Sequence, residues 1–340
     1  MKIIIATGIY PPEVGGPAQY AKNLSNIWKG EGHSVFTNVF SLWNFLPTGL
    51  RHFVYFCSMF PDVIWTDFVL VLDTFSSALP ALLAAKICRK KIILRTGGDF
   101  LWELYVERTG DLVLLRDFYD TCLPKFSFKE RIIFKTTKWI LKNQDAIIWS
   151  TEWQKDIFMK PYGLHEQNNF VIENFYGPRV ESFEPKAKNF IFFTRILKWK
   201  NIDFLKKVFA RDDVIGSGAI LDTAAGEHSK FLEAIKNSYG VIITSLGDVS
   251  PNTILDAIRC QKPFILTKEN GLTPRIKDIG LFVDPKNEDD VAKKIIWLCN
   301  DSNYLEQKKK IMAFDFVHTW EEIAREYMEI YNKINEGSIN

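Results

Sequence analysis

The chain has 340 residues, which is long enough for two domains of ordinary size. Hydrophobic residues make up 47% and charged residues 25% of it, a balance that excludes a disordered chain and is typical of a folded one. The net charge of +2 gives no indication of nucleic acid as a partner, because nucleic-acid-binding proteins usually carry strongly basic surfaces.

The five cysteines show no sign of a disulfide framework or a zinc site, because they lack the paired spacing that either would need. Scattered thiols of this kind favour the reducing cytoplasm, and we expect the chain to be cytoplasmic. The first ten residues hold only a short apolar run before Pro11 and Pro12, which predicts a β-strand and not a signal peptide. No uncharged apolar run approaches the length that spans a bilayer.

Short apolar strands alternate with helical stretches along the chain. The pattern predicts, in the first half, strands at 2–6, 34–40, 63–66, 91–95 and 146–150, helices at 18–28 and 76–87, and a helical region that ends near residue 141. A Phe-Tyr-Gly-Pro sequence and charged residues predict a linker at 174–188. The second half is predicted to contain strands at 189–194, 241–245 and 264–266 and helices at 203–209 and 321–332.

Strands that alternate with helices predict parallel, doubly wound sheets, in which ligands bind at the carboxyl ends of the strands. Two such halves joined by a linker predict an α/β protein of two Rossmann-like domains that face each other across a cleft. We therefore expect an N-terminal domain at 1–182, a second domain at 183–318, and a closing helix within 319–340 that crosses back to the first domain.

The segment Thr244–Thr267 contains the most informative motif. Its apolar strand leads into a loop, after which Ser250 and Pro251 are predicted to start a helix, since Ser is a strong N-cap and Pro is favoured at the first helical position. Asp248 precedes this helix and Asp256 lies inside it. Free N–H groups at a helix start suit a phosphate, and ionised carboxylates accept hydrogen bonds from sugar hydroxyls. The motif predicts a site for a phosphorylated sugar; alternatively, the two acids only complement the helix dipole.

Two further loops follow predicted strands. Gly15 and Gly16 precede the first helix, where glycines let backbone N–H groups approach an anion closely; the alternative is a loop that only needs positive φ. The spacing is not G-x-G-x-x-G, so no nicotinamide cofactor is predicted. Arg195 and Lys200 follow the first strand of the second half, and this pair of cations suits a diphosphate; the alternative is a solvated basic turn.

Together these motifs resemble those of glycosyltransferase family 4, the retaining GT-B enzymes. The segments that carry the resemblance stand in the family's order: YPPEVGGPAQYAKNLS (Tyr10–Ser25), STEWQKDIF (Ser150–Phe158), VIENFY (Val171–Tyr176), the pair Arg195 and Lys200, and SPNTILDAIRCQKPFI (Ser250–Ile265). The resemblance covers nearly the whole chain and implies a two-domain GT-B fold. It implies transfer of a sugar, with retention of configuration, from a UDP- or GDP-linked donor to a hydroxyl of a glycan or lipid-linked acceptor.

The resemblance also implies roles for individual residues. Arg195 and Lys200 would grip the donor diphosphate and stabilise charge on the departing nucleotide. Asp248 matches the first glutamate of the family's motif, expected at the donor sugar, and Asp256 matches the second, expected at the ribose. Asp99 matches an acidic position near the acceptor, and with Arg195, Lys200 and Asp248 it completes the expected catalytic set. Further donor contacts are expected from two loops: Gly15, Gly16, Ser250, Pro251, Asn252 and Thr253.

Departures from the family's pattern leave other functions open. Both motif glutamates are aspartates here, and Thr96 stands where many members have His. These changes favour a catalytically weak subunit that binds a nucleotide or glycan and supports a partner enzyme. A nucleotide-sugar epimerase is a third hypothesis, although no dedicated acid–base set is present. The residue types that bind metals do not cluster in the sequence, so we expect neither a metal ion nor another cofactor.

A basic, aromatic-rich stretch runs from Lys125 to Lys142. Arg131, Lys135, Lys138 and Lys142 fall at steps of four, three and four residues, which places them on one stripe of a helix. A helix of this kind can lie on an anionic membrane surface, and we expect the chain to contact the cytoplasmic face of a membrane here. The alternative is a surface helix whose apolar face docks on the chain's own sheet.

Overall fold

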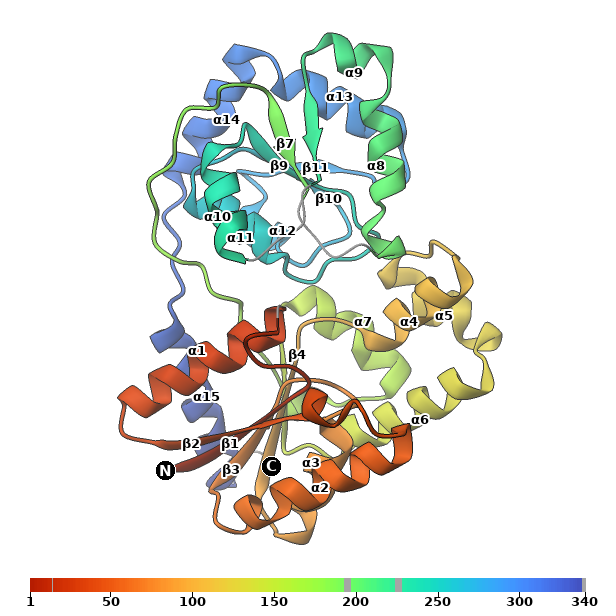
Figure 1. Ribbon diagram of the computed structural model, residues 1–340, viewed down its shortest axis with the longest axis vertical. Coiled ribbons are helices and arrows are strands. Elements are labelled where there is room, and N and C mark those ends of the chain that lie inside the picture. The colour runs from red at the N-terminus through yellow and green to blue at the C-terminus, as the bar shows by residue number, and fades with distance from the viewer. Residues whose placement is uncertain (14, 193–196, 224–227, 338–340) are drawn as a thin grey trace. The chain divides into compact units, whose positions relative to one another are not determined.

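The computed structural model describes residues 1–13, 15–192, 197–223 and 228–337. They form two compact units, which are drawn in Figure 1. Unit 1 consists of Met1–Leu101, Lys125–Asn174 and Thr319–Asn340, and unit 2 consists of Trp102–Pro124 and Phe175–His318. The sequence pattern did not predict that Trp102–Pro124, which lies in the first half of the chain, belongs with unit 2.

Unit 1 is built on a sheet of six parallel strands in the order β2-β1-β3-β4-β5-β6. In chain order the strands are β1 (Lys2–Thr7), β2 (Ser34–Val39), β3 (Phe68–Val71), β4 (Lys91–Thr96), β5 (Ala146–Trp149) and β6 (Asn169–Val171). The central strands β1, β3 and β5 are buried over most of their length, because helices cover both faces of the sheet. The predicted parallel sheet is therefore confirmed.

The predicted strand at 63–66 is wrong. Val63 and Ile64 end helix α2 (Thr48–Ile64), and the strand begins later, at Phe68. Tyr55, Met59 and Val63 lie at steps of four residues and form the buried stripe of α2, so the apolar pair that suggested a strand is the last turn of a helix. Periodicity cannot assign so short an apolar run to a strand or to a helix.

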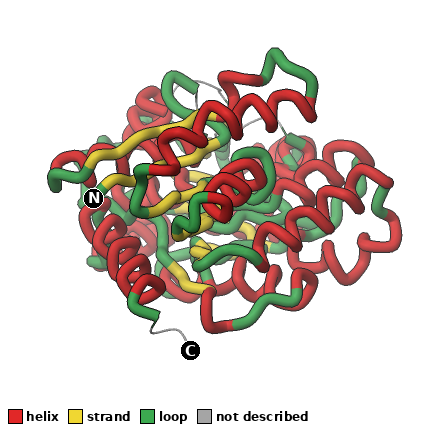
Figure 2. The backbone as a smooth tube through the Cα atoms, turned by 90° about the horizontal axis from the view of Figure 1, so that it is seen from below, coloured by secondary structure: helices red, strands yellow, loops and turns green. Residues whose placement is uncertain are grey.

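Helices pack on both faces of the unit 1 sheet (Figures 1 and 2). They include α1 (Gly16–Gly30), α2, α3 (Ala78–Ile87), α6 (Phe128–Lys142), α7 (Glu152–Tyr162) and α15 (Trp320–Asn335). The step from β1 to β2 crosses the sheet in one direction and the later steps cross it in the other. Right-handed crossovers therefore place α1 on one face and α2, α3, α6 and α7 on the opposite face. Helix α15 packs against α1, where Trp28 Nε1 donates to the carbonyl of Ala324.

Unit 2 contains a second parallel sheet, in the order β11-β10-β9-β7-β8. Its strands are β7 (Asn189–Ile191), β8 (Ile220–Asp222), β9 (Gly240–Ile243), β10 (Phe264–Thr267) and β11 (Leu281–Val283). Its helices are α8 (Ile202–Phe209), α9 (Asp212–Gly216), α10 (His228–Asn237), α11 (Asn252–Arg259), α12 (Thr273–Ile276), α13 (Glu288–Leu298) and α14 (Asp301–Ala313). Trp102–Pro124 adds most of α4 (Phe100–Thr109) and α5 (Phe118–Cys122).

Ser250 does not cap α11, contrary to the prediction. The helix begins at Asn252, and Pro251 occupies the N-cap position, where its side chain makes no capping hydrogen bond. The N–H of Asp248 donates to the carbonyl of Glu269 (2.9 Å), and the N–H of Gly271 donates to the carbonyl of Val249 (3.0 Å). These bonds to the loop after β10 hold the residues before Ser250 outside the helix, so the first turn starts later.

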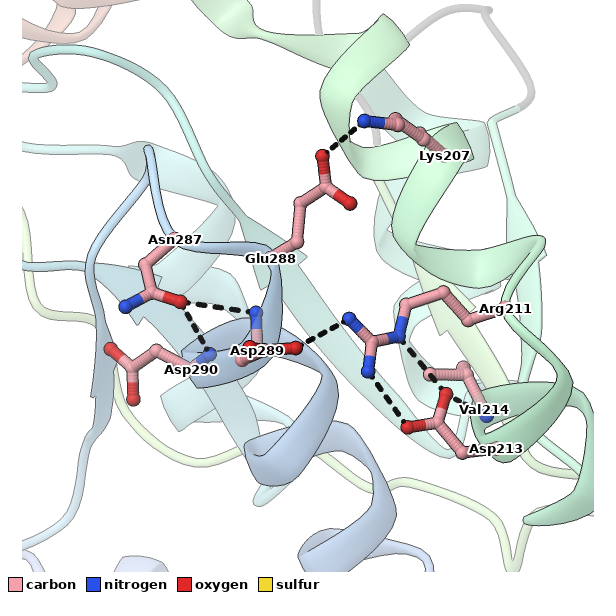
Figure 3. Close-up of polar contacts among 8 residues, drawn as sticks. All are labelled: Lys207, Arg211, Asp213, Val214, Asn287, Glu288, Asp289 and Asp290. Atoms are coloured by element: carbon pink, nitrogen blue, oxygen red, sulfur yellow. Dashed lines mark hydrogen bonds and ion pairs between the residues drawn. The ribbon is translucent and has the colours of Figure 1, made fainter.

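A group of ion pairs joins α9 and α8 to α13 at the periphery of unit 2 (Figure 3). The guanidinium of Arg211 lies between the carboxylates of Asp213 (2.9 Å) and Asp289 (2.7 Å), and Lys207 pairs with Glu288. The side chain of Asn287 accepts from the first N–H groups of α13 and caps this helix. These contacts connect helix surfaces and fit a structural role, because exposed pairs of this kind contribute little each.

Among the described residues, no helix combines the length and the apolar character that crossing a membrane requires. The predicted fold class, an α/β protein with two doubly wound parallel sheets, agrees with both units.

Candidate functional site

The sheet of unit 2 has a topological switch point between β7 and β9. The chain steps from β7 to β8 in one direction and from β9 through β10 to β11 in the other. Helices that follow β7 and β9 therefore lie on opposite faces, and in sheets of this kind ligands bind between the two loops at the carboxyl ends of such strands. Lys200 lies in the first of these loops and Asp248 in the second, so two predicted site residues come to the place where α/β sheets bind ligands.

Lys200 and Asp248 form an ion pair across this switch point. The Nζ of Lys200 lies 2.6 Å from Oδ2 of Asp248, and both side chains are largely buried. Ser245 donates its hydroxyl hydrogen to the same carboxylate oxygen, at 3.0 Å. Lys200 Nζ also lies 4.1 Å from the ring centre of Trp199. A short, charge-assisted hydrogen bond of this kind fixes both charges at the edge of the sheet.

Asn201 fixes the backbone beside Lys200. Its φ of 63° lies in the left-handed region, which Asn tolerates better than most residues. Its side-chain amide donates to the carbonyls of Thr244 (3.2 Å) and Pro285 (2.8 Å). These bonds join the loops that follow β7, β9 and β11, so the position of Lys200 depends on the whole edge and not on one turn.

Asp256 lies in the second turn of α11, buried, with its Oδ1 3.0 Å from the Nη1 of Arg259. The residues predicted to contact the donor at the start of this helix differ in exposure. Pro251 is buried, Ser250 and Thr253 are half-buried, and Asn252 is exposed. The predicted site residue Arg195 lies outside the described residues.

Glu269 is a site residue that the sequence reasoning missed. It lies two residues after β10, its side chain is buried, and the Nε of Arg116 donates to its carboxylate. Burial raises the pKa of Glu269, and the neighbouring guanidinium opposes this shift. Its place just past a predicted strand, at the same edge as Asp248, is a signal that could have found it. No signal in the sequence pointed to Arg116, which comes from Trp102–Pro124.

We name Trp102–Pro124 the arm. Its backbone N–H at Leu115 donates to the carbonyl of Leu246 (3.1 Å), and Trp102 packs on Trp199, with ring centres 5.1 Å apart. A Cβ atom at Gly247 would come within 2.4 Å of the Cβ of Leu115, so this close approach requires glycine. The arm therefore packs on the two loops that hold Lys200 and Asp248.

A cavity of about 350 Å³ lies beside these loops in unit 2. Its lining residues come from the arm, from the loops after β9 and β11, and from the start of α8: Leu112, Asn201, Phe204, Leu246, Pro285 and Lys286. The walls are mostly apolar, with one amide and one cation.

In unit 1 the switch point falls between β1 and β3, and Gly15 and Gly16 follow β1. Gly15 occupies the N-cap position of α1 in an extended conformation, so it does not serve a positive φ as the alternative supposed. A Cβ atom at Gly15 would lie 2.6 Å from Cδ1 of Ile9. A side chain at this position would therefore require the end of the Ile9 side chain to move.

Asp99 follows β4 and is buried, and its Oδ1 accepts the N–H of Leu101 at 3.0 Å. The preceding strand contributes Arg95, which is also buried and which the sequence reasoning did not single out. Its guanidinium donates to Ser150 (2.9 Å) and Asn174 (2.6 Å). These bonds join β4 to the end of β5 and to the last residue of unit 1 before the linker.

Comparisons with known proteins agree with this architecture. No family model and no curated protein matches the chain. Among solved structures, sucrose-phosphate synthase from Thermosynechococcus elongatus matches with a TM-score of 0.68 and 12% identity over 99% of each chain. Anabaena Alr3699/HepE in complex with UDP-glucose matches with a TM-score of 0.64 and 14% identity over 99% of each chain. The catalytic domain of starch synthase IV from Arabidopsis thaliana, bound to ADP and acarbose, matches with a TM-score of 0.67 and 12% identity over 98% of this chain and 99% of that one. These likenesses confirm the predicted fold: the chain has the two-sheet GT-B fold of glycosyltransferases.

Proposed function

We propose that the protein is a glycosyltransferase that moves a sugar from a nucleotide-sugar donor to an acceptor hydroxyl. The observation that carries the proposal is the pairing of Lys200 with Asp248 at the switch point of unit 2. A cation for the diphosphate and a carboxylate for sugar hydroxyls are the two groups that this donor needs, and they meet where doubly wound sheets bind ligands. The shared fold with glycosyltransferases supports the proposal.

In this proposal the leaving group is stabilised by charge. The ammonium of Lys200 binds the donor diphosphate together with Arg195, and both cations stabilise the negative charge that grows as the glycosidic bond breaks. When the diphosphate engages Lys200, Asp248 is released from its ion pair to accept hydrogen bonds from the donor sugar. The site thus exchanges an internal ion pair for two contacts with the donor.

The other predicted residues complete the proposal. Asp256 accepts hydrogen bonds from the ribose hydroxyls, and the start of α11 from Ser250 to Thr253 offers backbone N–H groups to the donor. Gly15 and Gly16 of unit 1 contact the donor, and Asp99 of unit 1 lies near the acceptor. We also propose that the anomeric configuration is retained, as the resemblance to family 4 implies.

The proposed donor is UDP- or GDP-linked, and the proposed acceptor is a glycan or lipid-linked glycan. Support for a uridine nucleotide comes from Alr3699/HepE, which was solved with UDP-glucose. Among the described residues, no group of three or more His, Cys, Asp or Glu side chains is placed to hold a metal ion. We propose transfer that depends on the cations Arg195 and Lys200 and not on a metal.

We also propose that the acceptor reaches the protein at a membrane surface. Helix α6, which covers most of Lys125–Lys142, packs Ile133, Thr137 and Ile140 on unit 1, as the alternative supposed. Lys135 and Lys142 are nevertheless exposed. Docking on the sheet and contact with anionic lipid are therefore compatible, because they use opposite sides of the helix.

A catalytically weak binding subunit is the second candidate. Thr96 stands where many family members have His, and its hydroxyl donates to the carbonyl of Gly98 within the same turn (2.9 Å). This threonine is thus occupied by local structure, which favours binding without turnover.

A panel of nucleotide sugars tests the proposal. The ligand that raises the melting temperature most identifies the donor, because binding to the native state stabilises it. Release of nucleoside diphosphate that requires an acceptor supports the transferase. Binding without release supports the subunit, and isomerised donor without acceptor supports an epimerase. If no member of the panel shifts the melting temperature, the proposed donor site is wrong.

A further inference from the structure

The outer surface of α2 and α6 in unit 1 exposes large apolar side chains where surface helices ordinarily present polar ones. On α2, the 3-10 helix η1 (Phe40–Trp43) and the loop between them, the exposed residues include Leu42, Phe45, Leu50 and Phe53. On α6 they are Phe128, Ile132 and Trp139. Phe45 is 77% exposed and Phe128 is 81% exposed, so neither ring is covered by its own unit. We name this surface the α2–α6 face.

Helix α2 is apolar on two opposite sides. Tyr55 and Met59 lie on its buried side, against the sheet layer. Leu50, Phe53 and Cys57 follow one another at steps of three and four residues on the outer side, and all three are exposed. A surface helix normally buries one apolar side and exposes a polar one, so a second apolar side indicates a partner that is itself apolar.

Helix α6 combines apolar and basic residues on its outer side. Five exposed residues form one stripe, at steps of four, three, four and three: Phe128, Ile132, Lys135, Trp139 and Lys142. The only acid of the helix, Glu130, is buried and accepts the N–H of Ser127 in a capping box. Within the part of the chain that the structure describes, Lys135 and Lys142 form no ion pair. The stripe therefore presents uncompensated positive charge beside aromatic rings.

The two helices belong to one layer. Helix α3 contacts both α2 and α6, and the strand order places all three on the same face of the sheet, as Figure 1 shows. Residues 32–61, which include η1 and most of α2, contain no Asp or Glu. The apolar outer side of α2, whose single acid, Asp62, lies in the last turn, and the basic outer side of α6 thus lie in the same helical layer.

We propose that the α2–α6 face binds the surface of a bilayer that contains anionic lipid. Phe45, Phe53, Phe128 and Trp139 enter the boundary between headgroups and acyl chains, while the lysines of α6 contact the anionic headgroups. This deepens the proposed function, since it adds α2 and η1 to the lipid contact of α6. The proposed function supplies only the biological reason for membrane binding, and the lipid contact itself does not depend on it.

A second copy of the chain fits this face less well. In a two-fold dimer the same patch meets itself, so the α6 lysines of both copies would come together, and the stripe that carries them contains no acid. An anionic bilayer offers an apolar layer to the exposed rings and negative charge to the lysines. The bilayer is therefore the occupant that matches both the rings and the cations.

Flotation of the full-length chain with vesicles tests the proposal without donor or acceptor, so it is independent of catalysis. We expect binding to phosphatidylcholine vesicles that contain phosphatidylglycerol, weaker binding to phosphatidylcholine alone, and a decline as salt is raised. The double variant Phe45→Ser, Phe53→Ser should weaken binding about tenfold or more, because two buried rings are lost. Lys135→Gln with Lys142→Gln should weaken binding to anionic vesicles about tenfold.

Matched control variants come from unit 2. Leu305 is 64% exposed, the same fraction as Phe53, so Leu305→Ser removes an equally exposed apolar side chain. Lys293→Gln with Lys309→Gln removes two exposed cations. We expect both controls to bind vesicles as the wild type does, and all the variants to keep the wild-type melting temperature, because every substituted side chain is exposed.

An environment-sensitive fluorophore on Cys57 measures insertion directly. This cysteine is exposed on the outer stripe of α2, and Cys88→Ser removes the half-exposed cysteine that could compete for the label. We expect a blue shift of emission with anionic vesicles. No vesicle binding at low salt, no shift at Cys57, or vesicle binding that survives both double variants would overturn the proposal. Self-association abolished by Phe45→Ser, Phe53→Ser would assign the face to a second copy.

Discussion

The carboxyl edges of the two sheets use their carboxylates differently. At the switch point of unit 1, Asp73 accepts from the backbone N–H groups of Phe75 (2.9 Å), Ser77 (3.1 Å) and Ala78 (3.3 Å), which leads into α3. At the switch point of unit 2, Asp248 pairs instead with the side chain of Lys200. Asp73 is thus held by backbone N–H groups and by the hydroxyl of Ser77, whereas Asp248 pairs with the charged side chain of Lys200.

This difference indicates which edge can bind a charged ligand. A carboxylate that satisfies N–H groups at a helix start cannot leave without orphaning them, and that cost is structural. Lys200 and Asp248 can exchange their mutual contact for a diphosphate and a sugar, because both partners are themselves side chains. The donor diphosphate is therefore expected on unit 2, and the Asp73 edge of unit 1 is expected to serve as a preformed scaffold.

The largest effect should come from Asp248→Asn. An amide keeps the size of the side chain but replaces one acceptor oxygen with a donor group, so a sugar contact that strengthens in the transition state is lost. We expect turnover to fall by about 10- to 100-fold, more than donor affinity falls, by analogy with the loss of one charge-assisted bond. Steady-state rates with the matched donor and acceptor measure this. Unchanged kinetics would remove the difference between the two edges.

Gly247→Ala should separate the arm from the site loops. The new Cβ would overlap Leu115, and overpacking of this kind costs about 1–3 kcal/mol of unfolding free energy. Urea denaturation measures the loss, and proteolysis should become faster within Trp102–Pro124. Gly216→Ala is the control, because no atom lies within 4 Å of a Cβ atom built there. Equal stability of the two variants would show that the arm does not depend on this contact.

Asp73→Ala addresses the edge of unit 1. The substitution removes the carboxylate that accepts the N–H groups before α3. The loss of stability should resemble that of a helix cap, about 1–2 kcal/mol of unfolding free energy. Donor affinity should remain that of the wild type. Thermal or urea unfolding, together with a donor titration, measures both quantities. A large loss of affinity in a folded variant would place Asp73 itself in the donor site.

The smallest effect should come from Asp256→Asn, which we expect to reduce donor affinity about five- to tenfold through the ribose contact, or roughly 1 kcal/mol. Glu233→Gln is the matched control, because Glu233 pairs with Lys236 at the same three-residue spacing within a helix of unit 2. Isothermal titration with the donor measures both variants. An equally small change in both would leave Asp256 as a structural partner of Arg259.

Much of the fold could be predicted, because local apolar patterns indicate where strands and helices alternate. The strand at 63–66 failed because the last turn of α2 is as apolar as a strand, and only the stripe from Tyr55 to Val63 reveals the helix. Ser250 failed as a cap because bonds from Asp248 and Val249 to another loop override its local preference. Trp102–Pro124 could not be assigned to unit 2, since its contacts are distant in sequence.

The candidate site was predictable in part. Lys200 and Asp248 each follow a predicted strand, and the two strands are consecutive in the sequence pattern. A parallel sheet brings the carboxyl ends of such strands to one edge, so the two side chains could be expected to meet. Glu269 obeys the same rule and was within reach. Arg116 and Gly247 were not, because their roles come from the packing of the arm, and no local pattern records which unit a surface segment will join.

The most direct test of the central claim is the affinity of Lys200→Ala for a nucleoside diphosphate and for the corresponding nucleoside. Lys207→Ala is the control, because Lys207 pairs with Glu288 at the periphery of unit 2 (Figure 3). Losing a charge-assisted phosphate contact costs about 1.5–3 kcal/mol, so calorimetry should show the diphosphate bound about 10- to 100-fold more weakly by Lys200→Ala, with the nucleoside nearly unaffected. Equal losses for the two ligands, or none for the diphosphate, would contradict a donor diphosphate at Lys200.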